Sequence, residues 1–185
     1  MRRLAAAFSI VLALIAGGCA HRPYQGELMA NVDQPYTVGS GDRLRIIVFG
    51  QDSLSNSYSV DASGQISMPL IGLVPVSGMN VQQIQQAIES RLRAGFLREP
   101  RVSCEVEAYR PFFILGEVVN SGQYPYVNGM TVQTAVAIGG GYTPRAAQSR
   151  ARITRVIEGR QVIGDVDMTY PVLPGDTIQI RERFF

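Results

Sequence analysis

The sequence predicts an α+β protein built from two small units, each with one main helix packed on short strands. Two segments, residues 81–94 and 132–138, carry apolar residues at helical spacing. Short apolar or alternating runs lie on both sides of each segment, and turn residues separate them. One helix among several strands, occurring twice, predicts two layered α+β units.

The first unit is expected to begin with a strand over Leu44–Phe49. Gly39, Gly41 and Asp42 signal a turn immediately before this β-rich run. Two further short strands follow, on either side of a turn at residues 62–64.

The helix of the first unit has clear start and stop signals. Asn80 is a suitable N-cap with Gln83 three residues later, and Gly95 ends the segment. One face of this helix collects the apolar residues Val81, Ile84, Ile88 and Leu92. Pro100 then opens a run in which Val102, Cys104, Val106 and Ala108 alternate with polar residues, which predicts a strand with one buried face.

The second unit repeats this organisation. We expect a strand, a turn at residues 120–122, a second strand, and a short helix with Thr131 as its N-cap. A hairpin turning at Glu158-Gly159 follows. The final strand comes after Pro174-Gly175-Asp176, which repeats the Ser40-Gly41-Asp42 turn, and the boundary between the units is expected at residues 109–111.

Three consecutive glycines, residues 139–141, raise the possibility of a phosphate-binding loop. Phosphate is bound where free N–H groups and the positive end of the dipole meet, at a helix N-terminus. These glycines follow the last helical residue, so we interpret them as a helix stop. The chain also has no Lys, which excludes a Walker A loop and Schiff-base chemistry.

The first residues have the order of an export signal. Arg2 and Arg3 precede the apolar run Leu4–Ala16, and small residues then lead to Cys19. This run is shorter than the ~20 residues that a membrane-spanning helix needs. The segment resembles a bacterial lipoprotein signal, which implies that residues 1–18 are removed and that Cys19 is acylated; ordinary cleavage nearby is the alternative.

The mature chain carries no net charge. Removal of Arg2 and Arg3 leaves 15 of the 17 basic residues against 15 acidic ones. A nucleic-acid partner is therefore not expected, because such proteins carry surplus positive charge on one face.

The chemistry-bearing side chains do not indicate an enzyme, a cofactor or a metal site. The single His, His21, lies beside the predicted lipid, where it is poorly placed for a triad or a zinc site. Cys104 alternates with apolar neighbours, so a buried structural role is favoured over a reactive thiol, and no disulfide with Cys19 is expected. Asp165 and Asp167 share one face of a predicted strand, where a solvated face is favoured over a pair of catalytic acids.

Several long stretches carry a family resemblance. "YTVGSGDRLRIIVFGQDSL", "YSVDASGQISMPLIGLVPVSGMNVQQIQQAI" and "REPRVSCEVEAYR" resemble the polysaccharide export domain of the Wza-like outer-membrane polysaccharide export (OPX) proteins. "FFILGEVVNSGQYPYVNGMTVQTAVAIGGGYTPRAA" is similar to the soluble-ligand-binding β-grasp (SLBB) module that follows it in that family. The resemblance implies a signal peptide at 1–18, a flexible leader at 19–34, an export domain at 35–109 and an SLBB β-grasp domain at 110–185.

The resemblance also implies a function. It suggests a lipid-anchored protein on the periplasmic face of the outer membrane, assembled into a homo-oligomeric ring through which capsular or extracellular polysaccharide leaves the cell. An inner-membrane polysaccharide co-polymerase is the partner implied for driving export. The sequence has no C-terminal amphipathic helix, so it resembles the short class, for which a separate outer-membrane β-barrel is a candidate partner. Phe184 and Phe185 are candidates for a docking tip, although a strand end packed in the core is favoured.

Two other functions remain open from the sequence. One is a periplasmic carbohydrate-active or peptidoglycan-associated enzyme that contains a β-grasp module. The other is an accessory polysaccharide-binding module that never forms a pore.

Overall fold

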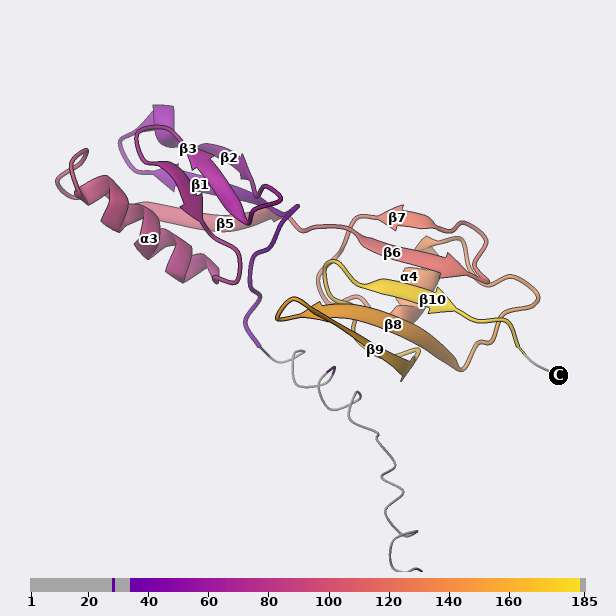
Figure 1. Ribbon diagram of the computed structural model, residues 1–185. Coiled ribbons are helices and arrows are strands. Elements are labelled where there is room, and N and C mark those ends of the chain that lie inside the picture. The colour runs from indigo at the N-terminus through magenta and orange to yellow at the C-terminus, as the bar shows by residue number, and fades with distance from the viewer. Residues whose placement is uncertain (1–27, 29–33, 184–185) are drawn as a thin grey trace, which may run out of the picture.

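The computed structural model describes Leu28 and residues 34–183. The chain forms two units that lie side by side, and the segment between β5 and β6 leads from one to the other (Figure 1). The predicted signal peptide, Cys19, His21 and the pair Phe184–Phe185 lie outside the described residues, so those predictions stay untested.

The N-terminal unit contains one long helix and five strands. Its sheets have the orders β2-β1-β5 and β3-β4, and every strand pair is antiparallel. The elements are β1 (Arg43–Val48), the 3-10 turn η1 (Asp52–Leu54), β2 (Asn56–Ser59), β3 (Gln65–Met68), β4 (Gly72–Pro75), α3 (Val81–Arg93) and β5 (Val102–Ala108).

Helix α3 begins and ends as its sequence predicts. The Asn80 side chain accepts from the backbone N–H of Gln83, and the Gln83 side chain accepts from the backbone N–H of Asn80. This capping box satisfies two N–H groups that would otherwise have no partner. Ile84, Ile88 and Leu92 are fully buried, so the predicted apolar face packs on the strands.

Strand β5 departs from the predicted alternation at its end. Val102 and Cys104 are buried, but Val106 is half-buried and Ala108 is exposed. The reason is a shift in register beside Arg43 and Leu44, which takes the last residues of β5 away from the core. The prediction of a buried face over the whole strand was therefore wrong for Ala108.

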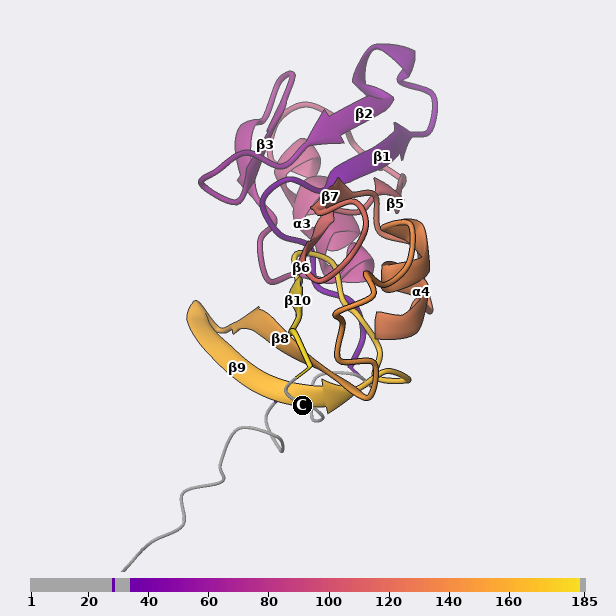
Figure 2. The same ribbon diagram turned by 90° about the vertical axis from the view of Figure 1, so that its right-hand side faces the viewer.

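The C-terminal unit is a five-stranded sheet of order β7-β6-β10-β8-β9 with one short helix. Strand β10 is parallel to β6 and antiparallel to β8, which places the last strand of the unit in the middle of the sheet. Figure 2 shows this sheet nearly edge-on, with α4 on one side of it. The elements are β6 (Phe112–Gly116), β7 (Gly122–Tyr124), α4 (Val132–Ile138), β8 (Arg150–Ile157), β9 (Arg160–Asp167) and β10 (Thr177–Ile180).

The local signals of this unit are also confirmed. The Thr131 side chain caps α4 by accepting from the backbone N–H of Thr134, and Gly139 is the C-cap. Gly140 and Gly141 have positive φ, so the three glycines stop the helix, as the sequence predicts. Glu158 and Gly159 also have positive φ and form the two-residue turn of the β8–β9 hairpin.

Each unit has its own buried core, and the α+β prediction is confirmed. The N-terminal core lies between α3 and the strands β1–β5, and the C-terminal core lies between α4 and the five-stranded sheet. Leu28 is an exception to chain order, because it precedes the N-terminal unit but is fully buried in the C-terminal core. The domain bounds assigned from the resemblance stay a prediction.

Candidate functional site

A groove lies at the junction of the two units. It consists of two hollows, of about 350 and 590 Å³, that share Pro35, Tyr36 and Tyr109. The first hollow lies between the units and is also lined by Gln34, Thr37, Arg110, Tyr126, Asn128, Arg155, Val156, Leu173 and Pro174. The second extends along the N-terminal unit and is also lined by Asn80, Val81, Gln82, Cys104, Glu105 and Val106.

Two equivalent turns lie beside this groove, one from each unit. Asp42 accepts from the backbone N–H of Gly39 at 2.8 Å, and Asp176 accepts from that of Leu173 at 2.7 Å. Both carboxylates are buried, and each turn leads directly into a strand, β1 or β10. The sequence repeat at these positions therefore corresponds to the same local structure in both units.

Arg110 connects the two turns. Its backbone N–H donates to Asp42 Oδ1 at 2.7 Å, and its Nη1 lies 3.5 Å from Asp42 Oδ2. On the other side, its Nε donates to the carbonyl of Pro174 at 3.1 Å. A Cβ at Gly175, whose φ is +86°, would lie 3.0 Å from that Nε, so glycine permits the close approach. One side chain thus joins the N-terminal unit to the C-terminal unit.

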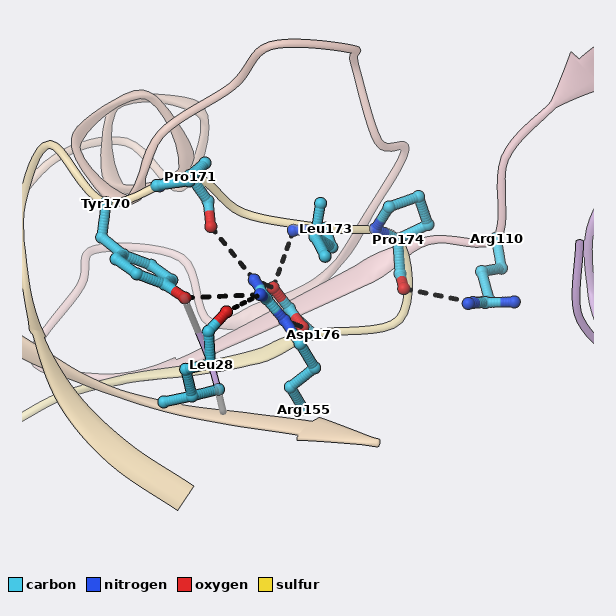
Figure 3. Close-up of polar contacts among 8 residues, drawn as sticks. All are labelled: Leu28, Arg110, Arg155, Tyr170, Pro171, Leu173, Pro174 and Asp176. Carbon is cyan, nitrogen blue, oxygen red and sulfur yellow. Dashed lines mark hydrogen bonds and ion pairs between the residues drawn. The ribbon is translucent and has the colours of Figure 1, made fainter. Parts of the chain in front are cut away.

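Arg155 is the centre of a second cluster, in which Arg155, Asp176, Tyr170 and Leu28 are buried (Figure 3). Its Nε and Nη2 donate to the two oxygens of Asp176 at 2.9 and 2.7 Å, a bidentate ion pair. The same guanidinium donates to the carbonyl of Pro171 at 3.1 Å, to that of Leu28 at 3.3 Å and to the Tyr170 hydroxyl at 3.4 Å. It therefore binds the segment that carries Leu28 to the C-terminal unit.

The two buried charges affect each other. Burial raises the pKa of the Asp176 carboxyl, although Arg155 and the Leu173 N–H act in the opposite direction. Burial alone would lower the pKa of Arg155, but the hydrogen bonds and charge of Asp176 outweigh it, and the net pKa is raised. Each of the two groups is thus the main polar partner of the other inside the fold.

A row of three tyrosines crosses the junction. The rings of Tyr36 and Tyr109 are 4.9 Å apart at 85°, and those of Tyr109 and Tyr126 are 5.4 Å apart at 77°. The Tyr36 hydroxyl donates to Asp42 Oδ2 at 2.5 Å, and the Arg110 guanidinium lies 5.8 Å from the Tyr36 ring centre. Burial, followed by the Asp42 hydrogen bond, raises the pKa of Tyr36. Such edge-to-face rings pack the junction while each remains half-buried.

Of the side chains that the sequence singled out, Cys104 lines the second hollow, whereas Asp165 and Asp167 lie away from the groove. Cys104 is buried at 5% exposure, and burial raises the pKa of its thiol to about 11. Asp165 pairs with Arg152 at 3.2 Å and with Arg181 at 2.8 Å, and Asp167 lies 3.5 Å from Arg150. These two acids are part of a charged sheet surface, which agrees with the favoured structural interpretation.

The groove was not predicted as a site from the sequence. The repeated Gly-Asp turns were the only available signal, and they do not reveal that Arg110 joins them. Within the described part of the chain, no group of three His, Cys, Asp or Glu side chains could hold a metal ion. The described helices also include none with the length and apolar character needed to cross a bilayer.

Both units match known family models. Residues 30–107 match the model described as polysaccharide biosynthesis/export protein, and residues 111–166 match the SLBB domain model. The two matches follow each other in the chain and together include β1–β8 and both helices.

Curated relatives are similar to most of this chain. The exopolysaccharide production protein ExoF of Rhizobium meliloti (strain 1021) is 34% identical, over 78% of this chain and 35% of its own length. The EPS I polysaccharide export outer membrane protein EpsA of Ralstonia solanacearum is 28% identical, over 77% of this chain and 45% of its own. The polysialic acid transport protein KpsD of Escherichia coli is 23% identical, over 59% and 20%. The chain thus spans less than half the length of these relatives.

Proposed function

This chain belongs to the Wza-like family of outer-membrane polysaccharide export proteins, with an export domain followed by one SLBB domain. We therefore propose that it is a component of a polysaccharide export channel. The observation that carries this proposal is the pair of family domains in order, joined by Arg110. The Arg110 guanidinium contacts both units. Such contacts suit a subunit of a channel wall, in which the two domains must keep a fixed orientation relative to each other.

The proposed location is the periplasmic face of the outer membrane, with Cys19 as the lipid attachment site. The signal-like order of residues 1–18 supports export, and the names of the EpsA relatives include "outer membrane protein". Cys19→Ser is expected to abolish incorporation of labelled palmitate and to release the mature chain from membranes. Incorporation that persists in this variant would refute Cys19 as the attachment site.

The proposed assembly is a homo-oligomeric conduit that receives the polymer from an inner-membrane co-polymerase. The sheet face opposite α4 supports an interface, because it exposes Phe113, Leu115 and Ile163 at 41, 38 and 48%. Sheet register places Phe113, Thr177, Thr154 and Ile163 in one row across four strands. Phe113 and Leu115 are neighbours on this face of β6, and Thr177 and Thr154 lie between Phe113 and Ile163. Exposed apolar side chains of this kind are found on association surfaces.

Native mass spectrometry of the lipidated chain in detergent tests this assembly. We expect a discrete oligomer, and Ile163→Glu should shift it toward monomer because a charge would be buried in the contact. Gln133→Glu, at an exposed position of α4 on the other side of the sheet, is the control. A chain that stays monomeric at every concentration, alone and with its membrane partners, would contradict the conduit.

A deletion strain tests the function itself. Polymer that is synthesised but retained in the cell is the expected result. Secreted polymer with altered length or substitution would instead favour a carbohydrate-active enzyme, and normal secretion would favour an accessory binding module. Complementation by the full chain, but not by the Cys19→Ser variant, would tie export to the membrane anchor.

A further inference from the structure

We propose that the junction groove is a weak saccharide-binding site that accepts an uncharged stretch of polysaccharide chain, an inference that rests on the proposed export function. The groove's two hollows share Pro35, Tyr36 and Tyr109 in their linings, so together they follow an extended stretch of surface rather than one closed pocket. Its volumes lie within the range of about 300–1,000 Å³ that is usual for small-molecule sites. An elongated open groove suits a segment of a polymer better than a free monosaccharide.

The tyrosine row supplies the apolar surface that sugar rings require. A pyranose presents C–H groups on its faces and hydroxyls around its rim, so its binding sites combine aromatic rings with planar polar groups. Tyr36, Tyr109 and Tyr126 are each half-buried and line the groove, which leaves part of each ring available. Tyr36 and Tyr109 line both hollows, and Tyr126 lines the first.

Neutral polar side chains line both hollows of the groove. Gln34, Thr37 and Asn128 are exposed on the hollow between the units, and Gln82 is exposed on the other. Amide and hydroxyl groups both donate and accept hydrogen bonds, as sugar hydroxyls do. These exposed side chains can bind the hydroxyl rim of a saccharide without having to be buried.

The cations of the first hollow are already compensated, and Glu105 adds a negative charge to the second hollow, so the groove disfavours an anionic ligand. Arg110 lies beside Asp42, and Arg155 is paired with Asp176 at 2.7 Å, so the two cations of the first hollow have buried anionic partners. A phosphate or a carboxylate would need a surplus cation in the groove. Among the described residues, the Nη2 of Arg110 has no hydrogen-bond partner, and it can donate to a neutral hydroxyl.

Weak binding is the expected regime. A site along an export path must release each segment as the polymer advances, so affinity in the millimolar range suits this role better than tight binding. Half-buried rings and exposed amides are expected to give such affinity, because they remain accessible to water, which competes with the saccharide for the same contacts.

The chain's own tyrosines provide the test. It has eight Tyr and no Trp, so a full-length sample with labelled tyrosine rings gives a small set of NMR signals spread over both units. The probe is the oligosaccharide mixture released by partial hydrolysis of the polysaccharide that the producing strain secretes. We expect signals of Tyr36, Tyr109 and Tyr126 to shift, while those of Tyr58, Tyr124 and Tyr170 stay in place.

Variants separate the groove from general effects. Tyr109→Leu should weaken binding about three- to tenfold, the size expected for one lost aromatic contact. Tyr124→Leu is the matched control, since Tyr124 stacks on Phe112 away from the groove. The double variant Gln34→Ala/Asn128→Ala removes only exposed side chains, so it should fold normally and weaken binding by a similar factor.

Salt discriminates the ligand's charge. Binding should be unchanged at about 0.3 M NaCl, because no ionic contact is being screened. Loss of binding at that concentration would overturn the uncharged ligand, and shifts that spread over all eight tyrosines or are absent would overturn the site. If the oligosaccharide shifts Tyr36, Tyr109 and Tyr126 in the monomer but not in the oligomer, a second copy of the chain occupies the groove. That result would also overturn the proposal.

The result of the saccharide-binding test can be distinguished from the result of the export test. A deletion strain that retains its polymer, together with no tyrosine shifts, would leave the export function standing and remove the groove as a saccharide site. Normal export by the deletion strain, together with shifts at the three groove tyrosines, would remove the function and leave the binding site.

Discussion

Replacement of Arg155 by Met is expected to destabilise the C-terminal unit by about 3–5 kcal/mol. The Arg155 side chain is 4% exposed and that of Asp176 is 1% exposed, so the variant leaves a carboxylate buried without its cation. Removal of one partner from a buried ion pair typically costs this amount. The carbonyls of Leu28 and Pro171 and the Tyr170 hydroxyl also lose a donor.

The loss should be measurable by thermal and urea unfolding of the full chain. For a unit of this size, a change of about 3 kcal/mol lowers the unfolding midpoint by about 12 °C or more. Arg152→Met is the matched control on the same strand, because Arg152 and Asp165 form a half-exposed pair at 3.2 Å. Such pairs contribute about 0–1 kcal/mol, so this control should stay close to the parent.

The pH dependence identifies the cause. Burial already raises the pKa of Asp176, and loss of Arg155 should raise it further. A carboxyl whose pKa is higher in the folded than in the unfolded state destabilises the fold when it is ionised, at high pH. This destabilisation disappears at low pH, where the carboxyl is protonated in both states. The deficit of Arg155→Met should therefore be large near pH 7 and shrink toward about pH 4.

Two results would refute this reasoning. One is a variant as stable as Arg152→Met, and the other is a deficit that is equal at both pH values, which would indicate lost packing instead of an unpaired charge. Adding Asp176→Leu to Arg155→Met should recover part of the stability, because removal of both ions leaves no buried charge.

Three further predictions concern the junction, the buried thiol and the helix cap. Arg110→Ala removes the side-chain contacts with Asp42 and Pro174, so the two units should unfold in transitions that are further apart in calorimetry than those of the parent. An unchanged calorimetric profile would mean that the tyrosine row alone couples the units. The pKa of Cys104 is raised from 9.0 to about 11, so a maleimide at pH 8 should alkylate the folded chain roughly a hundredfold more slowly than the urea-unfolded chain, and similar rates would contradict its burial. The same shift means that the thiol's contribution to stability is present below about pH 9 and is lost as the pH rises through about 11. Thr131→Ala removes the cap of α4 and should cost about 0.5–2 kcal/mol in urea unfolding, whereas Thr169→Ala, at an exposed position outside the helix, serves as a comparison.

Local signals in the sequence were sufficient to predict most of the individual elements. The capping boxes at Asn80 and Thr131 and the turn at Glu158-Gly159 each involve residues within four positions of one another. Their hydrogen bonds and backbone preferences are determined before any distant segment is in place. The same local rule identified the Gly139–Gly141 stretch as a helix stop and the chain as an α+β protein.

The pairing of strands was less accessible to local reasoning. Strands β2 and β3 are neighbours in the sequence, yet they belong to different sheets, and β4, which pairs with β3, was not predicted. The burial of β5 fades at Ala108 because of its register against β1. Register depends on the partner strand, which the strand's own alternation cannot identify.

What the sequence by itself determined about this protein is its α+β class, its capped helices, its turns and its family resemblance. Only the tertiary structure decided that Arg110, 68 positions from Asp42, joins the two Gly-Asp turns, and that Arg155 binds the carbonyl of Leu28, 127 positions away. The physical reason is that the hydrogen bonds of caps and turns are made with residues nearby in the chain. The hydrogen bonds and ion pairs of a buried charge are made with distant residues that folding brings into contact. The groove with its three tyrosines is a product of that second kind of contact, so it appears only when both units are in place.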